Sequence, residues 1–118
     1  MKSYLRVIVA TSMVFSVTVA QAYECKPTSA SACSGGECAT NVGSEMTIYF
    51  SEDEKTVSRC DKKGCSPVSV QVANSGVMLK AASAYNGYLL VIDKRDLSFT
   101  EVATSMTLLF VKSGSCVQ

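Results

Sequence analysis

Residues 55–72 read KTVSRCDKKGCSPVSVQV, with two cysteines close together between strand-like runs. Cys60 and Cys65 flank the short loop 61–64, which ends in a glycine, and a strand-like run lies on each side of it. Beyond the loop, small polar residues alternate with Val68, Val70 and Val72, which is the period of a strand with one buried face. The stretch therefore predicts a β-hairpin whose strands are joined covalently beside the turn.

A disulfide is the interpretation of Cys60 and Cys65 that the rest of the sequence favours. Residues that flank a four-residue hairpin loop face each other, at about the 3.5 to 4.5 Å between Cβ atoms that a disulfide needs. Gly64 supplies the positive φ that such a turn commonly requires. The chain has no histidine and no Cys-x-x-Cys motif of the kind that zinc sites and thioredoxin-like redox pairs use.

All six cysteines lie within residues 23–118, after an N-terminal segment with the pattern of an export signal. An even number of cysteines in a short exported chain indicates a disulfide framework. The segment CSGGEC at 33–38 repeats the same spacing and predicts a second local bridge. Cys25 and Cys116 are then left to join the two ends of the domain. A crossed pairing of Cys33 or Cys38 with a cysteine of the first hairpin stays open.

Outward from the hairpin, short runs rich in Val, Ile, Thr, Tyr and Phe alternate with turn residues. They predict about seven strands, in the runs 46–51, 55–60, 66–72, 77–85, 88–93, 97–103 and 107–113. The fold class is therefore all-β: a small antiparallel meander that forms a disulfide-stapled barrel or half-barrel, with a two-sheet sandwich as the alternative. A short helical turn at 81–84 is the one place where helix competes.

The domain organisation predicted from composition is one β domain over residues 23–118. Residues 23–44 are rich in Ser, Ala, Gly and Thr and contain few large apolar side chains, so we expect an irregular arm tied by disulfides. Residues 45–118 carry the antiparallel strands.

Residues 1–22 have the pattern of a signal peptide that is removed on export. Lys2 and Arg6 precede the apolar stretch 7–20, and Ala20-Gln21-Ala22 places small residues where a signal peptidase cuts. The apolar stretch is short for a membrane span, which needs about 20 residues, and we expect no membrane span after cleavage. The predicted location is periplasmic or secreted.

The charge balance bears on the class of partner. Removal of residues 1–22 takes away two of the eleven basic residues and none of the ten acidic ones, which leaves a net charge near −1. A nucleic-acid partner requires a clustered basic surface, so no nucleic acid is expected. An envelope or extracellular protein is the partner that remains, and the sequence predicts no oligomeric state.

Catalytic, metal-binding and cofactor-binding residues are not predicted. The chain lacks histidine for proton transfer, and disulfide formation leaves no free thiol as a nucleophile. The acidic residues gather in turns, at 52–54 and at Asp93 and Asp96, where carboxylates are usually solvated.

Two turns supply the candidate binding residues. Tyr85 and Tyr88 flank Asn86-Gly87, a dipeptide typical of a type I′ hairpin turn, and tyrosines offer large rigid contact surfaces. The alternative is a cross-strand tyrosine pair that only stabilises the hairpin. Lys62 and Lys63, at the tip of the first hairpin, are candidates for contacting an acidic partner, or else serve solubility.

Tyr-x-Cys after a signal peptide, SRCDKKGC at 58–65, FTEVAT at 99–104 and a cysteine near the terminus resemble a family of small exported, Cys-rich bacterial proteins of unassigned function. A looser similarity is to the periplasmic inhibitors of c-type lysozyme. That resemblance implies a small β-barrel whose ends are tied together, and Tyr23, Cys25 and Cys116 match its outline. The inhibitory Ser-Gly-x-x-Tyr loop of that family is not matched at 75–79, so no functional residue is carried over.

The function predicted from the sequence is that of an exported, non-enzymatic binding module, protein-binding or inhibitor-like. The alternative is a small barrel that carries an apolar ligand. The two hypotheses differ in what fills the barrel, because a carrier requires an apolar cavity of several hundred Å³.

Overall fold

The computed structural model describes residues 22–41, 45–84 and 87–118. The predicted signal peptide therefore lies outside the described residues, except for Ala22. The described part folds into strands, which are β1 (Ala22–Ser34), β2 (Glu37–Asn41), β3 (Thr47–Ser51), β4 (Thr56–Asp61), β5 (Gly64–Ser69), β6 (Gln71–Asn74), β7 (Met78–Ser83), β8 (Tyr88–Asp93), β9 (Ser98–Ser105) and β10 (Leu108–Val117).

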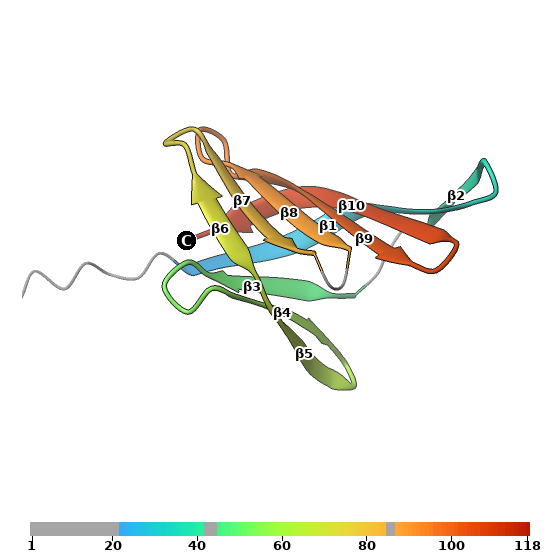
Figure 1. Ribbon diagram of the computed structural model, residues 1–118, viewed down its shortest axis with the longest axis horizontal. Helices are drawn as coiled ribbons and strands as arrows, with labels where there is room; N and C mark the ends of the chain where they lie inside the picture. Colours follow the sequence, from blue (N-terminus) through green and yellow to red (C-terminus); the bar gives the residue numbers. More distant parts are fainter. Residues whose placement is uncertain (1–21, 42–44, 85–86) are drawn as a thin grey trace, which may run out of the picture.

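All of these strands belong to one antiparallel sheet in the order β5-β4-β3-β1-β10-β9-β8-β7-β6, with β2 paired to β1 off this path. Sequential hairpins generate most of the order, whereas β1 inserts between β3 and β10 (Figure 1). The first and last strands of the described chain are therefore neighbours. The predicted antiparallel meander is confirmed.

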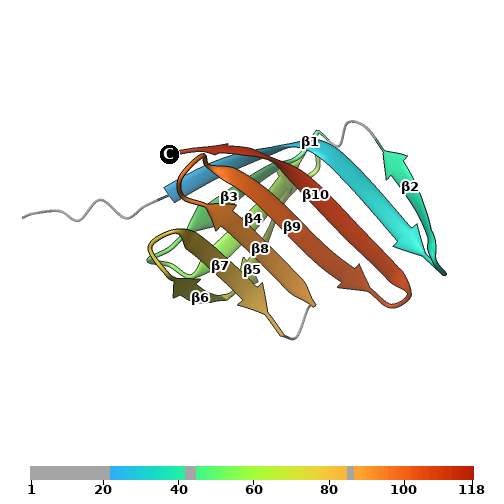
Figure 2. The ribbon, with the colours of Figure 1, turned by 90° about the horizontal axis from the view of Figure 1, so that it is seen from above.

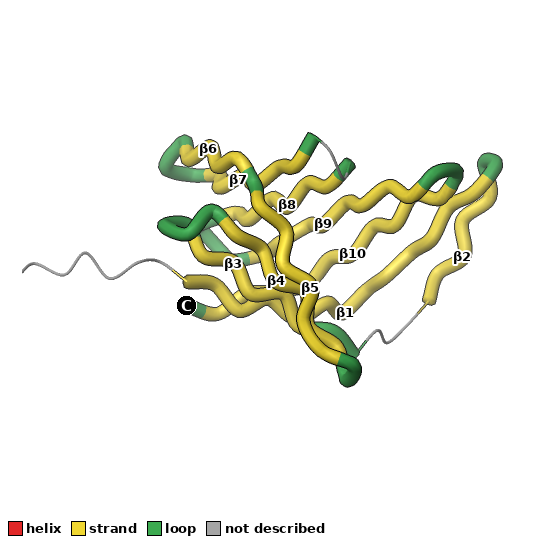
Figure 3. The backbone as a smooth tube through the Cα atoms, turned by 60° about the horizontal axis from the view of Figure 1, so that its bottom comes forward, coloured by secondary structure: helices red, strands yellow, loops and turns green. Residues whose placement is uncertain are grey.

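The sheet nearly closes into a barrel because its two outermost strands are parts of one continuous run. β5 and β6 are separated only by Val70, and Figure 3 shows the chain passing directly from one to the other. Val70 is buried, and its N–H donates to the carbonyl of Lys55 at 2.9 Å. The prediction of a single strand over 66–72 is therefore wrong. The chain bends at Val70 and forms both outermost strands of the sheet, β5 and β6, as chains do at barrel corners.

Alternate residues of the strands point into the barrel and fill it. The rings of Tyr23 and Phe50 stack with their centroids 6.0 Å apart. The core cluster consists of Tyr23, Cys25, Ile48, Phe50, Val57, Val70, Leu79, Ala81, Tyr88, Leu90, Ile92, Phe99 and Cys116. A barrel of this size has an interior that side chains can fill, and burial of these apolar groups stabilises the closed sheet.

The irregular arm predicted over 23–44 is wrong for the residues that the structure describes. This segment contains β1 and β2, and β1 pairs with β10 along almost its whole length, with a bulge between Pro27 and Ser29. The small residues of this segment gave little strand signal. The strand forms nevertheless, because its backbone is hydrogen-bonded to neighbouring strands on both edges and few large side chains are needed. Residues 42–44 lie outside the described part.

The three disulfides are those predicted, and no crossed pairing occurs: Cys25–Cys116, Cys33–Cys38 and Cys60–Cys65. Each joins residues that are directly opposite on neighbouring antiparallel strands. The prediction placed a four-residue loop inside each local bridge. In the structure the strands stay paired for one more residue on each side, which leaves two-residue turns at 35–36 and 62–63. Three bridges indicate an oxidising, extracytoplasmic environment.

Two parts of the sheet project from the barrel. One end is formed by β2 together with the adjoining parts of β1, β10 and β9, and it extends well beyond the remaining strands (Figures 1 and 2). We call this four-stranded part the projecting end. The β4–β5 hairpin points away from the barrel in another direction (Figure 1). The helical turn considered at 81–84 is absent from the described residues, because 81–83 belong to β7.

Candidate functional site

A buried carboxylate lies inside the barrel, on β9. Glu101 occupies an inward position between Phe99 and Ala103, and its side chain is only 1% exposed. Arg59 Nη2, on β4, donates to Glu101 Oε1 at 3.1 Å, and the hydroxyl of Tyr88, on β8, donates to Oε2 at 2.5 Å. We call these three residues the Arg59–Tyr88–Glu101 cluster.

Burial and the neighbouring carboxylate keep the phenol of Tyr88 protonated. Burial raises the pKa of Tyr88 well above its ordinary value, and the charge of Glu101 and the hydrogen bond to it add to the effect. The phenol therefore remains a donor, and the guanidinium of Arg59 compensates the carboxylate. Arg59 retains 29% exposure of its side chain, although its buried Nε lacks a partner among the described residues.

Lys112 adds a second cation near the cluster. Lys112 lies directly opposite Glu101 on the neighbouring strand, and its Nζ lies 3.8 Å from the sulfur of Met46. Burial lowers the pKa of Lys112, the neighbouring charge of Arg59 lowers it further, and Glu101 opposes the shift. Within the described ranges, Glu101 thus pairs with Arg59 and has the partly buried Lys112 opposite it on β10.

The geometry of the cluster suits a structural network. Each oxygen of Glu101 already accepts a hydrogen bond from within the barrel, and the carboxylate is almost fully shielded from solvent. Buried charges are tolerated only when paired and hydrogen-bonded in this way. The sequence analysis missed Glu101, although its place two residues after Phe99 in an alternating strand is a signal that it faces inward.

The predicted tyrosine site is not assembled as expected. Tyr88 is buried at 5% exposure and points at Glu101, so it does not project from a recognition turn. This corrects its assignment as a candidate binding residue, because the β8 register turns it toward the core. Tyr85 and Asn86 lie outside the described residues, so the predicted cross-strand tyrosine pair is outside them too.

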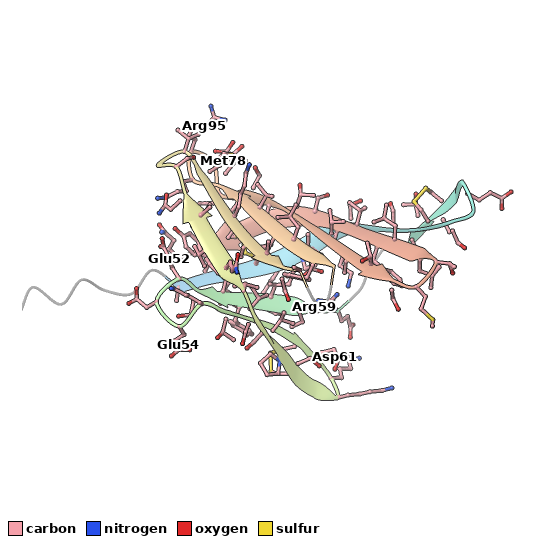
Figure 4. The ribbon with its side chains drawn as sticks, viewed as in Figure 1. Glu52, Glu54, Arg59, Asp61, Met78 and Arg95 are labelled. Carbon is pink, nitrogen blue, oxygen red and sulfur yellow. A yellow bond between two sulfur atoms is a disulfide. The ribbon has the colours of Figure 1, made fainter. Side chains whose placement is uncertain are left out.

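Lys62 and Lys63 form the turn of the β4–β5 hairpin, as predicted. The ammonium of Lys62 makes an exposed ion pair with Glu45 at 2.7 Å, and the backbone N–H of Lys63 donates to Asp61 at 2.8 Å. Figure 4 shows Asp61 near the far end of this hairpin, away from the barrel. The two lysines are thus separated from Tyr88, which faces the interior.

An exposed apolar group occurs at the tip of the β9–β10 hairpin. Met106, in the turn, is fully exposed, and Leu108 and Leu109 are 39% and 38% exposed. Leu109 is opposite Cys33 in the β1–β10 register, so Leu109 lies beside the Cys33–Cys38 bridge, whereas Leu108 points to the other face of the sheet. We call Met106, Leu108 and Leu109 the apolar tip. The sequence analysis placed strands here but did not single out these residues.

A surface hollow lies elsewhere, where the start of β1 and the end of β10 meet β3 and β4. It measures about 340 Å³, and its lining includes the exposed side chains of Tyr49 and Val117. Tyr49 is on the outer face of β3, since its neighbours Ile48 and Phe50 point into the core. This hollow therefore lies at the surface and is distinct from the filled interior of the barrel.

Comparisons of the chain with protein-family profiles, with curated proteins and with solved structures found no match. Within the described ranges, no helix has the length and apolar character to cross a membrane. The same residues contain no cluster of three or more potential metal ligands. The fold and its bridges thus define a small disulfide-stapled β-barrel.

Proposed function

We propose that the protein is an exported, non-enzymatic binding module, periplasmic or secreted, that recognises another envelope or extracellular protein in the manner of an inhibitor. The observation that carries this proposal is the apolar tip. Three large apolar side chains are exposed at the end of the β9–β10 hairpin, where they contribute nothing to the core: Met106 in the turn, with Leu108 and Leu109 on opposite faces of β10. A hairpin end that exposes large apolar side chains on both faces is suited to insertion into an apolar groove of a protein partner.

The support beneath the tip favours recognition by a rigid surface. Both leucines lie on β10, which pairs with β9 on one side and with β1 on the other. The Cys33–Cys38 bridge braces the adjoining β1–β2 hairpin. A preorganised surface loses little conformational entropy on binding, so more of the energy of apolar burial appears as affinity.

A non-enzymatic role fits the state of the polar groups. The buried Glu101 has both oxygens engaged, and the chain has no histidine. All six cysteines are in disulfides. Histidine and free thiols, two kinds of group that often transfer protons or attack substrates, are therefore not offered by this chain.

Carriage of a small apolar ligand is the second candidate. The hollow of about 340 Å³ beside Tyr49 and Val117 favours it, because its volume is within the range of small-molecule sites. The core side chains occupy the barrel interior, so a carrier would use this surface hollow. Saturable binding of an apolar fluorescent probe, reduced by Tyr49→Ser, is the result expected of a carrier.

Capture from an envelope extract tests the proposal. The oxidised protein is immobilised beside a tip variant that replaces the three apolar-tip residues with serine. A matched control replaces three other exposed apolar residues at the opposite end of the sheet, namely Tyr49, Val77 and Val117. We expect one partner to be retained by the wild type and the control and lost by the tip variant. Retention of that partner by the tip variant would contradict the assignment.

The similarity to lysozyme inhibitors gives the partner class that can be tested directly. A turbidity assay measures whether the wild type slows cell-wall lysis by c-type lysozyme, with the tip variant beside it. Inhibition lost in the tip variant supports an inhibitory role. If lysis proceeds unchanged and no partner is captured, the protein-binding proposal is wrong.

A further inference from the structure

The edge of β2 is open in the part of the chain that the structure describes. β2 pairs with β1 along one side, from the Ser34–Glu37 pair to the Ala30–Asn41 pair. No described strand lies along its other side. An open edge presents unpaired backbone N–H and C=O groups, which can template another strand.

The Cys33–Cys38 bridge fixes which groups face this open edge. Its Cα atoms are 4.0 Å apart, the short separation of a non-hydrogen-bonded pair in an antiparallel ladder. Because bonded and non-bonded pairs alternate, Ala39 exchanges its backbone bonds with β1. The N–H and C=O groups of Cys38 and Thr40 therefore point away from β1.

The edge of β5 offers a contrast within the same molecule. The Cys60–Cys65 pair has the same short Cα separation, 4.0 Å, so the same alternation makes Pro67 an outward position of β5. Proline has no N–H to donate there, and lysines occupy the adjoining turn. Proline and lysine are the residues with which proteins block strand pairing at edges. β2 contains neither of them.

We propose that β2 pairs antiparallel with β2 of a second copy of this chain, with the two-fold axis at Ala39. In this register Cys38 of one copy faces Thr40 of the other, and the reciprocal pair forms on the far side of the axis. Each pair brings two outward N–H groups to two outward C=O groups, which gives four intermolecular hydrogen bonds. All of the outward groups of Cys38 and Thr40 are then satisfied.

The register is also compatible in charge and shape. Glu37 stands opposite position 41 of the other copy, which is uncharged, so the two glutamates do not face each other. On one face of the projecting end, Ala39 is next to Ala32, and Ala32 is next to Phe110. Pairing about the axis joins this row to its copy, so small apolar residues continue across the new sheet.

The contact is short, and a weak, reversible dimer is expected. A five-residue edge buries much less area than the interfaces of permanent dimers. The dimer would present two apolar tips at once. The inference does not depend on the proposed function, because it rests on the backbone of β2 and not on the tip.

Sedimentation velocity of the oxidised full domain tests the dimer over a series from low-micromolar to near-millimolar protein. We expect the wild-type mass to rise from that of a monomer toward twice that value. Thr40→Pro removes an outward N–H and leaves the bonds to β1 in place, so this variant should remain monomeric. Thr40→Ala retains the N–H and should dimerise like the wild type. Disulfide mapping and circular dichroism verify that both variants are folded.

Charge complementation at the axis provides a second test that needs no loss of folding. Ala39→Lys and Ala39→Glu each place like charges directly opposite each other, so each variant alone should be monomeric. An equal mixture of the two should dimerise again. A wild type that stays monomeric throughout the series would overturn the proposal, as would dimerisation of Thr40→Pro or of either charged variant alone.

Discussion

Replacement of Glu101 by leucine tests whether the cluster in the barrel behaves as a paired network. The variant loses both hydrogen bonds of the carboxylate and leaves the Arg59 guanidinium and the Tyr88 hydroxyl without their acceptor. Hydrogen bonds to a charged group contribute about 1.5 to 3 kcal/mol each. Tyr88 is 5% exposed, so its hydroxyl loses the full energy of its hydrogen bond. Arg59 is 29% exposed, so its guanidinium recovers part of its hydrogen-bond energy from water.

The expected decrease in unfolding free energy for Glu101→Leu is therefore about 3 kcal/mol. A triple variant, Arg59→Met with Tyr88→Phe and Glu101→Leu, removes the stranded groups as well. Its expected decrease is below about 1 kcal/mol, because replacing a whole buried ion pair by apolar residues of similar volume is often neutral. The triple variant should thus be more stable than the single variant Glu101→Leu.

Urea denaturation followed by far-ultraviolet circular dichroism measures both values with the disulfides intact. With a slope of about 1 to 1.5 kcal/mol per M, the midpoint of Glu101→Leu should lie about 2 to 3 M below that of the wild type. A single variant within about 0.5 kcal/mol of the wild type would show that the contacts are unimportant. A triple variant as unstable as the single one would show that the ion pair itself stabilises the fold, which refutes the reasoning.

Two further predictions concern the bridges and the phenol. Replacing Cys25 and Cys116 by serine opens a closure with a sequence separation of 91 and should cost about 4.6 kcal/mol. The same change at Cys60 and Cys65, separated by 5, should cost about 2.1 kcal/mol and leave a folded β protein. Urea midpoints measure both, and equal losses would contradict the chain-entropy account. Because the pKa of Tyr88 is raised in the folded protein, its contribution is fully present below about pH 10, where the unfolded phenol titrates, and decreases as the pH rises further. Unfolding free energies between about pH 8 and 11 should therefore decline less steeply in Tyr88→Phe, and identical slopes would exclude this linkage.

Local sequence was sufficient to predict the hairpins and their bridges. Cys60 and Cys65, and likewise Cys33 and Cys38, are five positions apart across a turn that contains or adjoins glycine. Such a short closure leaves few alternatives once the flanking runs are strands, so spacing alone indicates the partner. The bridge between the chain ends then followed by elimination.

The course of residues 23–41 was decided by tertiary structure. Small residues such as those of β1 have weak strand preference, and the strand exists because β10, β3 and β2 accept its backbone hydrogen bonds. The bend at Val70 has the same origin, since a continuous alternating run bends only when the sheet must meet itself. Neither feature has a local signature.

The candidate sites show the same division. Alternation along 97–103 and 88–93 indicated strands, but the assembly of Arg59, Tyr88 and Glu101 depends on the register of three strands that are separated by up to 42 residues. The exposure of Met106, Leu108 and Leu109 likewise depends on how far the sheet extends past the barrel. The β-hairpins, their local disulfides and the all-β class were predictable from the sequence, because these features rest on contacts between near neighbours. Which side chains are buried together and which are left exposed depends on the three-dimensional fold, because strand register is set by the closure of the whole sheet.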